Sequence, residues 1–275
     1  FKLKIARKLI LSKWKEALGG NLEIIVSGSA PLQSRLAKVF TAADMTLVEG
    51  YGLTETSPII SVGDMRNYNL KMGTVGKVID GVELKIADDG EILCKGPNVM
   101  MGYFKEEIMT QEVMSGDYFH TGDIGEVDDE GFLKITDRKK EMFKTSGGKY
   151  IAPQVIESQM KQSLFIEQIM VVGAGRRMAT AIIQPNIDHV KNWLNENGIK
   201  CDSLSKAVQE PTLKKVIENE VEHHNQNFGS WEQVKKIELT PDEWSIDGGH
   251  LTPTMKLKRK VISEKYSNLI DNMYN

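Results

Sequence analysis

The chain is 275 residues long, of which 40% are hydrophobic and 27% charged, and 35 basic residues against 38 acidic ones give a net charge of −3. This balance excludes a generally basic nucleic-acid binder and an acidic disordered tail, and the composition is typical of a folded globular protein. The longest apolar runs, such as residues 24–26, are far shorter than the roughly 20 residues that a membrane-spanning helix needs.

The cysteines and the first residues indicate the setting of the chain. Cys94 and Cys201 are too few for a disulfide framework and lack the spacing of a zinc site, so we expect a reducing, cytoplasmic location. The chain begins with Phe1, and no apolar core of a signal peptide follows it. We therefore expect an excised piece of a longer protein, and a processed product is the alternative.

The first elements alternate between helix and strand. Residues 1–20 predict an amphipathic helix that ends at Gly19 and Gly20, and residues 22–26 predict a buried strand. A loop, a second helix with apolar residues at helical spacing, and a strand at residues 46–48 follow. A strand, a helix and a strand within about 30 residues predict one βαβ unit of a parallel sheet.

Short extended runs follow from about residue 73. We predict strands at residues 74–79, 82–87, 91–95, 124–127 and 132–136. Asp-Gly and Asp-Asp-Gly sequences separate several of the runs, and such turns are typical of hairpins. This part of the chain therefore predicts a small antiparallel barrel or sheet.

Helices and strands are mixed in the last part of the chain. We predict helices at residues 153–162, 186–197, 203–227 and 257–273, and strands at residues 166–172, 178–183 and 234–239. This mixture is typical of an α+β domain. The charged run at residues 137–141 is the predicted boundary before this part, although such a run by itself is more often a solvated turn.

Two familiar site patterns fail. Residues 146–149 resemble the end of a Walker phosphate loop, but Phe143 and Tyr150 stand where that loop needs a glycine and a Ser or Thr. The histidine pair at residues 223–224 has no matching set of metal ligands, so we interpret it as part of a polar helix face. Neither pattern supports a site of its own.

Residues 51–56 lie at the carboxyl end of a predicted parallel strand, where α/β proteins place their ligands. Gly52 lets the backbone approach a ligand closely, and Tyr51 offers a ring on which a purine can stack. Thr54 offers a hydroxyl group to a phosphate oxygen, and Glu55 offers a carboxylate to Mg²⁺. The alternative explanation is an ordinary turn with a capping Thr and Glu.

The same segment, with the sequence Tyr-Gly-Leu-Thr-Glu, resembles the signature of the adenylate-forming enzymes, which include acyl-CoA synthetases, luciferases and peptide-synthetase adenylation domains. Five other motifs resemble those of this family and stand in its order: Ser27–Leu32, Gly90–Pro97 with Met101–Tyr103, Tyr118–Asp123, Asp137–Lys140 and Leu251–Lys256. The resemblance spans about residues 22–270. Residues 137–153 and the end at residues 251–260 are most similar to the long-chain fatty acid–CoA ligases.

This resemblance implies a ligase reaction in two steps. The carboxylate of a fatty acid attacks the α-phosphate of ATP, which gives an acyl-adenylate and pyrophosphate. The thiol of CoA then attacks the acyl carbon and displaces AMP. Because two anions meet in the first step, the main requirement is neutralisation of charge, by Mg²⁺ and by the ammonium group of Lys256.

The resemblance also implies roles for the matching residues. Catalysis is expected of Lys256, Glu55 and Thr54, with Glu55 as the Mg²⁺ ligand. The residues expected to bind the nucleotide are Ser29, Ala30, Pro31, Tyr51, Gly52, Thr54, Asp123 and Arg138. The expected hinge between two domains is Asp137, and the expected CoA path runs along Ser146, Gly147 and Gly148. Rotation at the hinge would withdraw the lysine after adenylation and bring the glycine loop to CoA.

The implied fold is α/β followed by α+β. Residues 1–137 would be the C-terminal part of the large AMP-binding domain, with the end of a parallel α/β sheet at residues 1–72 and an antiparallel β-barrel at residues 73–137. Residues 138–275 would be the small, mobile C-terminal domain. The phosphate loop of the family and most of its acyl pocket precede all of these residues. We therefore expect an incomplete sheet with exposed apolar edges, and a fragment that is inactive without its N-terminal half.

Two other functions stay open. The substrate could be a different carboxylic acid, such as an aryl or amino acid, or the chain could be a non-catalytic module that binds a nucleotide or CoA. We expect no nucleic-acid partner, and we interpret the basic end at residues 251–275 as a solvated helix face. Peripheral contact with a membrane, the acyl chain length and the oligomeric state are not specified by the sequence.

Overall fold

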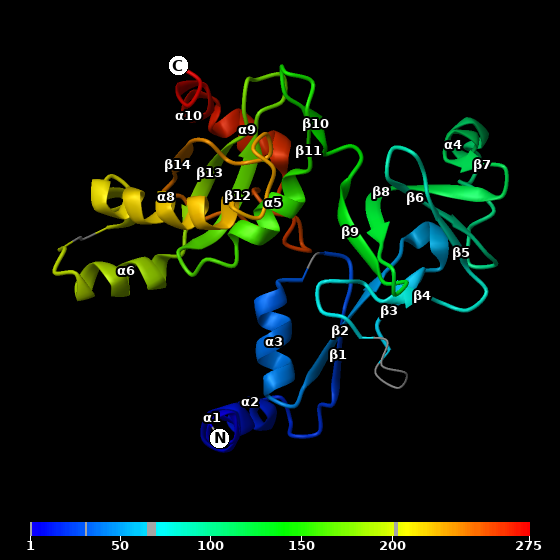
Figure 1. Cartoon of the computed structure of the whole chain (residues 1–275), viewed down its shortest axis with the longest axis horizontal. Coiled ribbons are helices and arrows are strands. Elements are labelled where there is room, and N and C mark those ends of the chain that lie inside the picture. The colour runs from blue at the N-terminus through cyan, green and yellow to red at the C-terminus, as the bar shows by residue number, and fades with distance from the viewer. Residues whose placement is uncertain (1, 31, 65–69, 201–202) are drawn as a thin grey trace. The chain divides into compact units, whose positions relative to one another are not determined.

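A computed structural model of the chain describes residues 2–30, 32–64, 70–200 and 203–275. The chain forms two compact units, the first ending at Lys139 and the second beginning at Lys140. Figure 1 shows the elements of both. Within the described ranges, no helix combines the length and apolar character that crossing a bilayer requires.

The first unit begins with the predicted N-terminal helix, which contains a π-helical turn. It consists of α1 (Lys2–Ala6), the π turn η1 (Arg7–Leu11) and α2 (Ser12–Ala17). The Gly20 N–H donates to the Lys15 carbonyl (2.8 Å), and the Gly19 N–H donates to the Glu16 carbonyl (2.9 Å). Both glycines have positive φ, so this paired closure ends the helix where the sequence predicts.

A four-stranded sheet follows, in the order β1-β2-β3-β4. The strands are β1 (Ile24–Ser27), β2 (Thr46–Tyr51), β3 (Ser61–Val62) and β4 (Lys77–Val78), and α3 (Ser34–Ala42) connects the first two. The β1 and β2 strands are parallel, with Ile24 opposite Thr46 and Ser27 opposite Glu49. This pair confirms the predicted βαβ unit, whereas β3 and β4 join it in antiparallel fashion.

The prediction that the first strand is buried is wrong. The β1 strand forms an edge of its sheet, and the side chains of Ile24 and Val26 are 49% and 67% exposed. Apolar content predicted burial, but Ile24 and Val26 point to the same face of the sheet and are exposed there, and among the described residues only β2 pairs with this strand. The exposed edge agrees with the expectation of an incomplete sheet.

A second sheet is antiparallel and contains five strands. They are β5 (Glu83–Ile86), β6 (Glu91–Lys95), β7 (Met114–Ser115), β8 (Tyr118–Val127) and β9 (Leu133–Arg138), with β8 between β6 and β7 and also paired with β9. The β8 strand begins six residues before the predicted one, and the short helix α4 (Glu107–Glu112) and β7 were not predicted. The predicted strand at residues 74–79 shrinks to β4, which pairs with β3 instead of joining this sheet.

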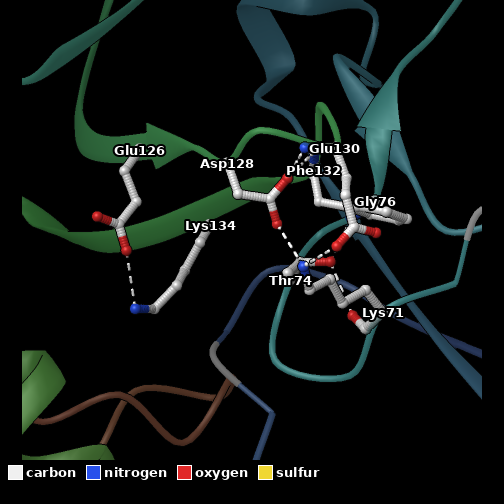
Figure 2. Close-up of polar contacts among 8 residues, drawn as sticks. All are labelled: Lys71, Thr74, Gly76, Glu126, Asp128, Glu130, Phe132 and Lys134. Carbon is white, nitrogen blue, oxygen red and sulfur yellow. Dashed lines mark hydrogen bonds and ion pairs between the residues drawn. The ribbon is translucent and has the colours of Figure 1, made fainter.

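The turn between β8 and β9 is bound to the segment that precedes β4 (Figure 2). Lys71 Nζ lies 2.7 Å from Asp128 Oδ2 and 3.0 Å from Glu130 Oε1. Asp128 Oδ1 also accepts from the Phe132 N–H, which shapes the turn. The Leu133 N–H donates to the Gly76 carbonyl, so backbone bonds and ion pairs together join the two sheets of the first unit.

The second unit is built on a three-stranded sheet with helices on both faces. Its strands are β12 (Ile166–Val172), β13 (Thr180–Pro185) and β14 (Ile237–Leu239), and the hairpin of β10 (Phe143–Lys144) and β11 (Tyr150–Ile151) precedes them. The helices are α5 (Pro153–Met160), α6 (Ile187–Glu196), α7 (Leu204–Ala207), α8 (Pro211–Asn225), α9 (Arg259–Lys265) and α10 (Ser267–Asn272). This mixture confirms the α+β prediction, except that two of the predicted helices are each broken in two.

Alternation along β12 creates two cores. Ile169 and Val171 pack with side chains from α5, α6 and α8, whereas Met170 packs with Trp244 and Ile262 on the other face. Successive side chains of a strand point to opposite faces, so this one strand supports both layers. The α9 helix, which follows Lys256 in the chain, is therefore fixed to the sheet through an apolar contact.

Candidate nucleotide site

The predicted signature lies at the end of β2 and continues into a single 3-10 turn, η2 (Thr54–Thr56). The buried Thr56 holds this turn, because its hydroxyl group accepts from the Leu53 N–H (3.0 Å) and donates to the Pro58 carbonyl (3.0 Å). Thr54 is exposed at the start of the turn. A Cβ atom on Gly52 would lie 1.6 Å from the Pro58 carbonyl oxygen, so this glycine is required by the chain itself.

Two predicted nucleotide-binding residues contact the carboxylate of a third, Asp123. Asp123 in β8 is 5% exposed and lies opposite Arg138 of β9. The Tyr51 hydroxyl group donates to Asp123 Oδ2 (2.9 Å), and Arg138 Nε lies 3.2 Å from Asp123 Oδ1. Tyr51 and Asp123 are 72 residues apart in the chain, so the fold creates this arrangement. Its chemistry is that of a buried acceptor between an aromatic ring and a cation.

The protonation of Tyr51 follows from its position. Burial raises the pKa of the Tyr51 phenol well above its usual value, and the negative charge of Asp123 raises it further. Tyr51 therefore stays a donor at neutral pH. A ligand hydroxyl group that approaches Asp123 would share the carboxylate with Tyr51 or displace it.

Glu55, the predicted metal ligand, is held by a residue for which the sequence predicted no role. The Tyr103 hydroxyl group donates to Glu55 Oε1 (2.9 Å), and the Met100 N–H donates to the Glu55 carbonyl (2.7 Å). Tyr103 belongs to the Met101–Tyr103 motif, which was the available signal for it. Burial, and then the hydrogen bond to Glu55 and its negative charge, raise the pKa of Tyr103, so this phenol also donates.

The surroundings of Glu55 bear on its capacity to hold a metal ion. Among the described residues, no three His, Cys, Asp or Glu side chains gather as a metal site. Mg²⁺, however, is often held by one or two carboxylates together with water and substrate phosphates. A carboxylate has about four acceptor positions, so the bond from Tyr103 leaves capacity on Glu55. Glu55 thus fits a magnesium ion shared with a bound phosphate chain.

The loop after β1, which holds three of the residues expected to bind the nucleotide, lies near the same end of the parallel strands. Ser29 and Ala30 follow β1, whose last residue pairs with Glu49, two residues before Tyr51. Ser29 is exposed and has φ of 72°. Pro31, also predicted to bind the nucleotide, lies outside the described residues.

An ion cluster around the buried Glu91, which the sequence did not predict, supports Asp123 and Arg138. Glu91 is 4% exposed, and its carboxylate lies 2.9 Å from His120 Nδ1 and 2.7 Å from Lys139 Nζ. The Gly122 N–H donates to Glu91 Oε1 (3.0 Å), and the Lys139 N–H donates to the Gly122 carbonyl (2.9 Å). Although burial raises the pKa of Glu91, the bonds from His120 and Lys139 hold it below its usual value. The cluster thus fixes the residues adjacent to Asp123 and Arg138.

The predicted hinge residue is not in a loop. Asp137 lies within β9, opposite Ile124, and is 1% exposed. Its carboxylate accepts from the Arg138 N–H (2.6 Å). The boundary between the two compact units falls after Lys139, two residues beyond Asp137. The hinge role of Asp137 stays a prediction.

The remaining predicted residues lie in the second unit. Lys256 is half-buried, in a turn that the bridge between Leu251 and Leu257 closes. The Lys256 N–H donates to Thr252 Oγ1 (3.1 Å), and the Thr252 N–H donates to the Lys256 carbonyl (2.8 Å). These bonds fix the backbone of Lys256 in the turn.

The predicted CoA-path residues form the exposed tip of the β10–β11 hairpin. They are Ser146, Gly147 and Gly148. The Gly148 N–H donates to the Thr145 carbonyl (2.9 Å), and Gly148 has φ of 74°, a conformation that favours glycine. The Ser146 N–H donates to the Arg176 carbonyl (2.8 Å), which ties the tip to the turn after β12.

Both units match families of known proteins. The family described as AMP-binding enzyme matches residues 4–104, and that described as AMP-binding enzyme C-terminal domain matches residues 141–275. The chain is 40% identical over 269 residues to the long-chain-fatty-acid–CoA ligase FadD15 of Mycobacterium bovis, covering 98% of this chain and 44% of that protein. It is 33% identical over 284 residues to the peroxisomal long chain acyl-CoA synthetase 7 of Arabidopsis thaliana, covering 97% of this chain and 41% of the relative.

A solved structure shares the fold. The A domain of carboxylic acid reductase from Segniliparus rugosus, in complex with AMP and a co-purified carboxylic acid, superimposes with a TM-score of 0.75 at 21% identity. The match covers 96% of this chain and 41% of that one. At this identity the likeness establishes the fold alone. The chain spans less than half the length of the curated relatives described above.

Proposed function

Because the chain belongs to the AMP-binding enzyme family, we propose that it forms the C-terminal half of an AMP-forming long-chain fatty acid–CoA ligase. The enzyme activates a fatty acid with ATP to an acyl-adenylate and transfers the acyl group to CoA, with release of AMP. The observation that carries the proposal is the contact of Tyr51 and Arg138 with the buried carboxylate of Asp123. Such a group suits the hydroxyl groups of a ribose.

The proposed nucleotide contacts follow from the positions of the side chains. Asp123 accepts hydrogen bonds from the ribose hydroxyl groups, and Arg138 adds a donor beside it. The ring of Tyr51 lies against the adenine, with Ser29, Ala30, Pro31 and Gly52 as the other nucleotide contacts. Thr54, exposed at the start of its turn, donates to the α-phosphate.

Adenylation brings a carboxylate to a polyphosphate, so cationic groups should dominate the first step. Glu55 would hold Mg²⁺ together with the phosphates, and the ion would screen their charge and orient the leaving pyrophosphate. Lys256 brings an ammonium group on a flexible stem to the same phosphates. Glu55 is oriented for this role by the hydrogen bond from Tyr103.

The finer domain assignment belongs to the same proposal. Residues 1–72 would end the parallel sheet of the large domain, residues 73–137 would form its barrel, and residues 138–275 would be the mobile small domain. Rotation at Asp137 would exchange Lys256 for the tip at residues 146–148 in the second step. The N-terminal half of the ligase would complete the phosphate loop and the acyl pocket, so the chain alone would not turn over.

The test is fatty-acid-dependent exchange of pyrophosphate into ATP by the intact enzyme. Exchange with long-chain fatty acids, and thioester formation after CoA is added, would support the proposal. Exchange with aryl or amino acids only would instead assign another substrate, and nucleotide binding without exchange would assign a non-catalytic module. Vesicle flotation would separate the proposed cytoplasmic location from peripheral membrane contact.

A further inference from the structure

A charged cluster in the second unit begins three residues after Lys256. Arg259 is the first residue of α9, and its guanidinium forms a two-pronged pair with Glu157 of α5. The Nη2–Oε2 distance is 2.6 Å, and the Nη1–Oε1 distance is 3.0 Å. The Arg259 Nε donates to Glu141 Oε2 (2.9 Å), so one side chain contacts two carboxylates from different segments.

The two carboxylates are in different surroundings. The Glu157 side chain is 7% exposed, and it also accepts from the Val171 N–H of β12 (2.7 Å). The Glu141 side chain is 33% exposed, and it borders a groove of about 630 Å³ that Leu257 and Arg259 also line. Glu157 is therefore shielded from water and binds Arg259 to the sheet, whereas water reaches the pair of Arg259 with Glu141.

This cluster is well placed to orient the Lys256 turn. Only two residues separate Lys256 from Arg259, and the first of them, Leu257, is already bridged to Leu251. Lys258, which precedes α9, makes no side-chain capping bond to the helix. The start of α9, and with it one end of the turn, is thus fixed by the Arg259 guanidinium together with the hydrogen bond from the Lys258 N–H to the His250 carbonyl (2.8 Å).

Through Glu141, the Arg259 guanidinium also contacts the start of the second unit. Glu141 is the second residue of this unit and lies between β9 and β10. The same guanidinium therefore holds the entry of the chain into the unit and the turn that carries Lys256. A bidentate Arg–carboxylate pair fixes orientation as well as distance, which a Lys at this position would not do.

We propose that Arg259, held by Glu157 and Glu141, is a positioning residue that aims Lys256 during adenylation. The inference rests on the proposed function, because it needs Lys256 to act on ATP. Arg259 touches no substrate in this role and acts only through the turn. Its loss should therefore affect the adenylation rate more than nucleotide binding.

The experiment uses the intact ligase and the variants Glu141→Gln and Arg259→Lys. We expect the kcat of pyrophosphate exchange to fall about 10-fold for Glu141→Gln and about 100-fold for Arg259→Lys, since small misplacement of a reacting group is enough for such losses. The KM for ATP should change less than about twofold, and thioester formation from supplied acyl-adenylate should be unchanged. Glu264→Gln, an exposed acid on α9, is the matched control.

Each outcome decides the question. Equal loss of both half-reactions together with a lowered melting temperature would show a structural role only and would overturn the inference. Unchanged exchange in both variants would overturn it as well. Glu141→Gln keeps the buried pair of Arg259 with Glu157, so it remains informative even if Arg259→Lys fails to fold. A wild-type enzyme without any exchange would instead overturn the proposed function.

Discussion

Replacing Asp123 by alanine tests the proposed nucleotide site most directly. The carboxylate is 5% exposed and already engages Tyr51 and Arg138, so it is in place before any ligand arrives. In the intact enzyme, its removal should weaken AMP binding without changing the fold. The change removes the proposed ribose acceptor and the shared partner of Tyr51 and Arg138, and it leaves Glu55 and Lys256 in place.

The expected magnitude follows from the bonds that Asp123 would make. Two ribose hydroxyl groups donating to a charged acceptor contribute about 1.5–3 kcal/mol each. Tyr51 and Arg138 lose their partner in the variant and can turn towards the ribose, which restores part of the loss. We expect a net loss of about 3 kcal/mol, which corresponds to roughly 100-fold weaker binding.

Calorimetric titration with AMP measures this loss. Glu126→Ala, on the same strand and in an exposed pair with Lys134, is the matched control and should bind AMP normally (Figure 2). Tyr51→Phe keeps the carboxylate and should weaken binding less than about 10-fold. A loss below about threefold for Asp123→Ala, or an equal loss for the control, would refute the assignment of the ribose to this carboxylate.

Three further predictions concern single side chains. Lys256→Ala in the intact enzyme should abolish acyl-adenylate formation but spare thioester formation from supplied acyl-adenylate; equal loss of both steps would contradict its role. Burial raises the pKa of Glu49 to about 6 from 4.5, so stability is greatest below pH 4.5 and falls as the pH rises through 6. Glu49→Gln should therefore flatten this fall and raise stability at pH 7 by about 1 kcal/mol after allowance for partial exposure, and thermal unfolding at pH 5 and pH 7 would show whether it does. Lys71→Met should lower the unfolding midpoint of the first unit at low salt, and the difference should vanish in 1 M salt, where exposed ion pairs are screened; a loss that persists there would assign Lys71 a packing role.

Local patterns in the sequence predicted much of the fold. Gly19 and Gly20 mark the end of the first helix because glycine adopts the positive φ of its closure without strain. The β12 strand was predicted with its observed bounds, Ile166–Val172, since apolar residues fill it between two turns. Elements without a local signal were missed, such as the short, polar α4.

Contacts between distant segments were beyond such patterns. The sequence suggested that Gly52 approaches a ligand, yet the atom closest to its missing Cβ belongs to Pro58. Tyr103 and Glu91 stand within quoted motifs, but their bonds to Glu55 and Lys139 span 48 residues each. The resemblance to the family's motifs identified the candidate residues, whereas the fold decides which of them touch.

The open strand β1 has a practical bearing on work with this polypeptide. Among the described residues β1 pairs only with β2, and an unpaired strand edge recruits other strands. The adjoining face also presents the apolar side chain of Val26, which is 67% exposed. Purified alone, the polypeptide should self-associate as its concentration rises, and light scattering would detect the growing particles. A gatekeeper charge introduced by Val26→Lys should keep it dispersed, and co-expression with the complementary half should make that charge unnecessary.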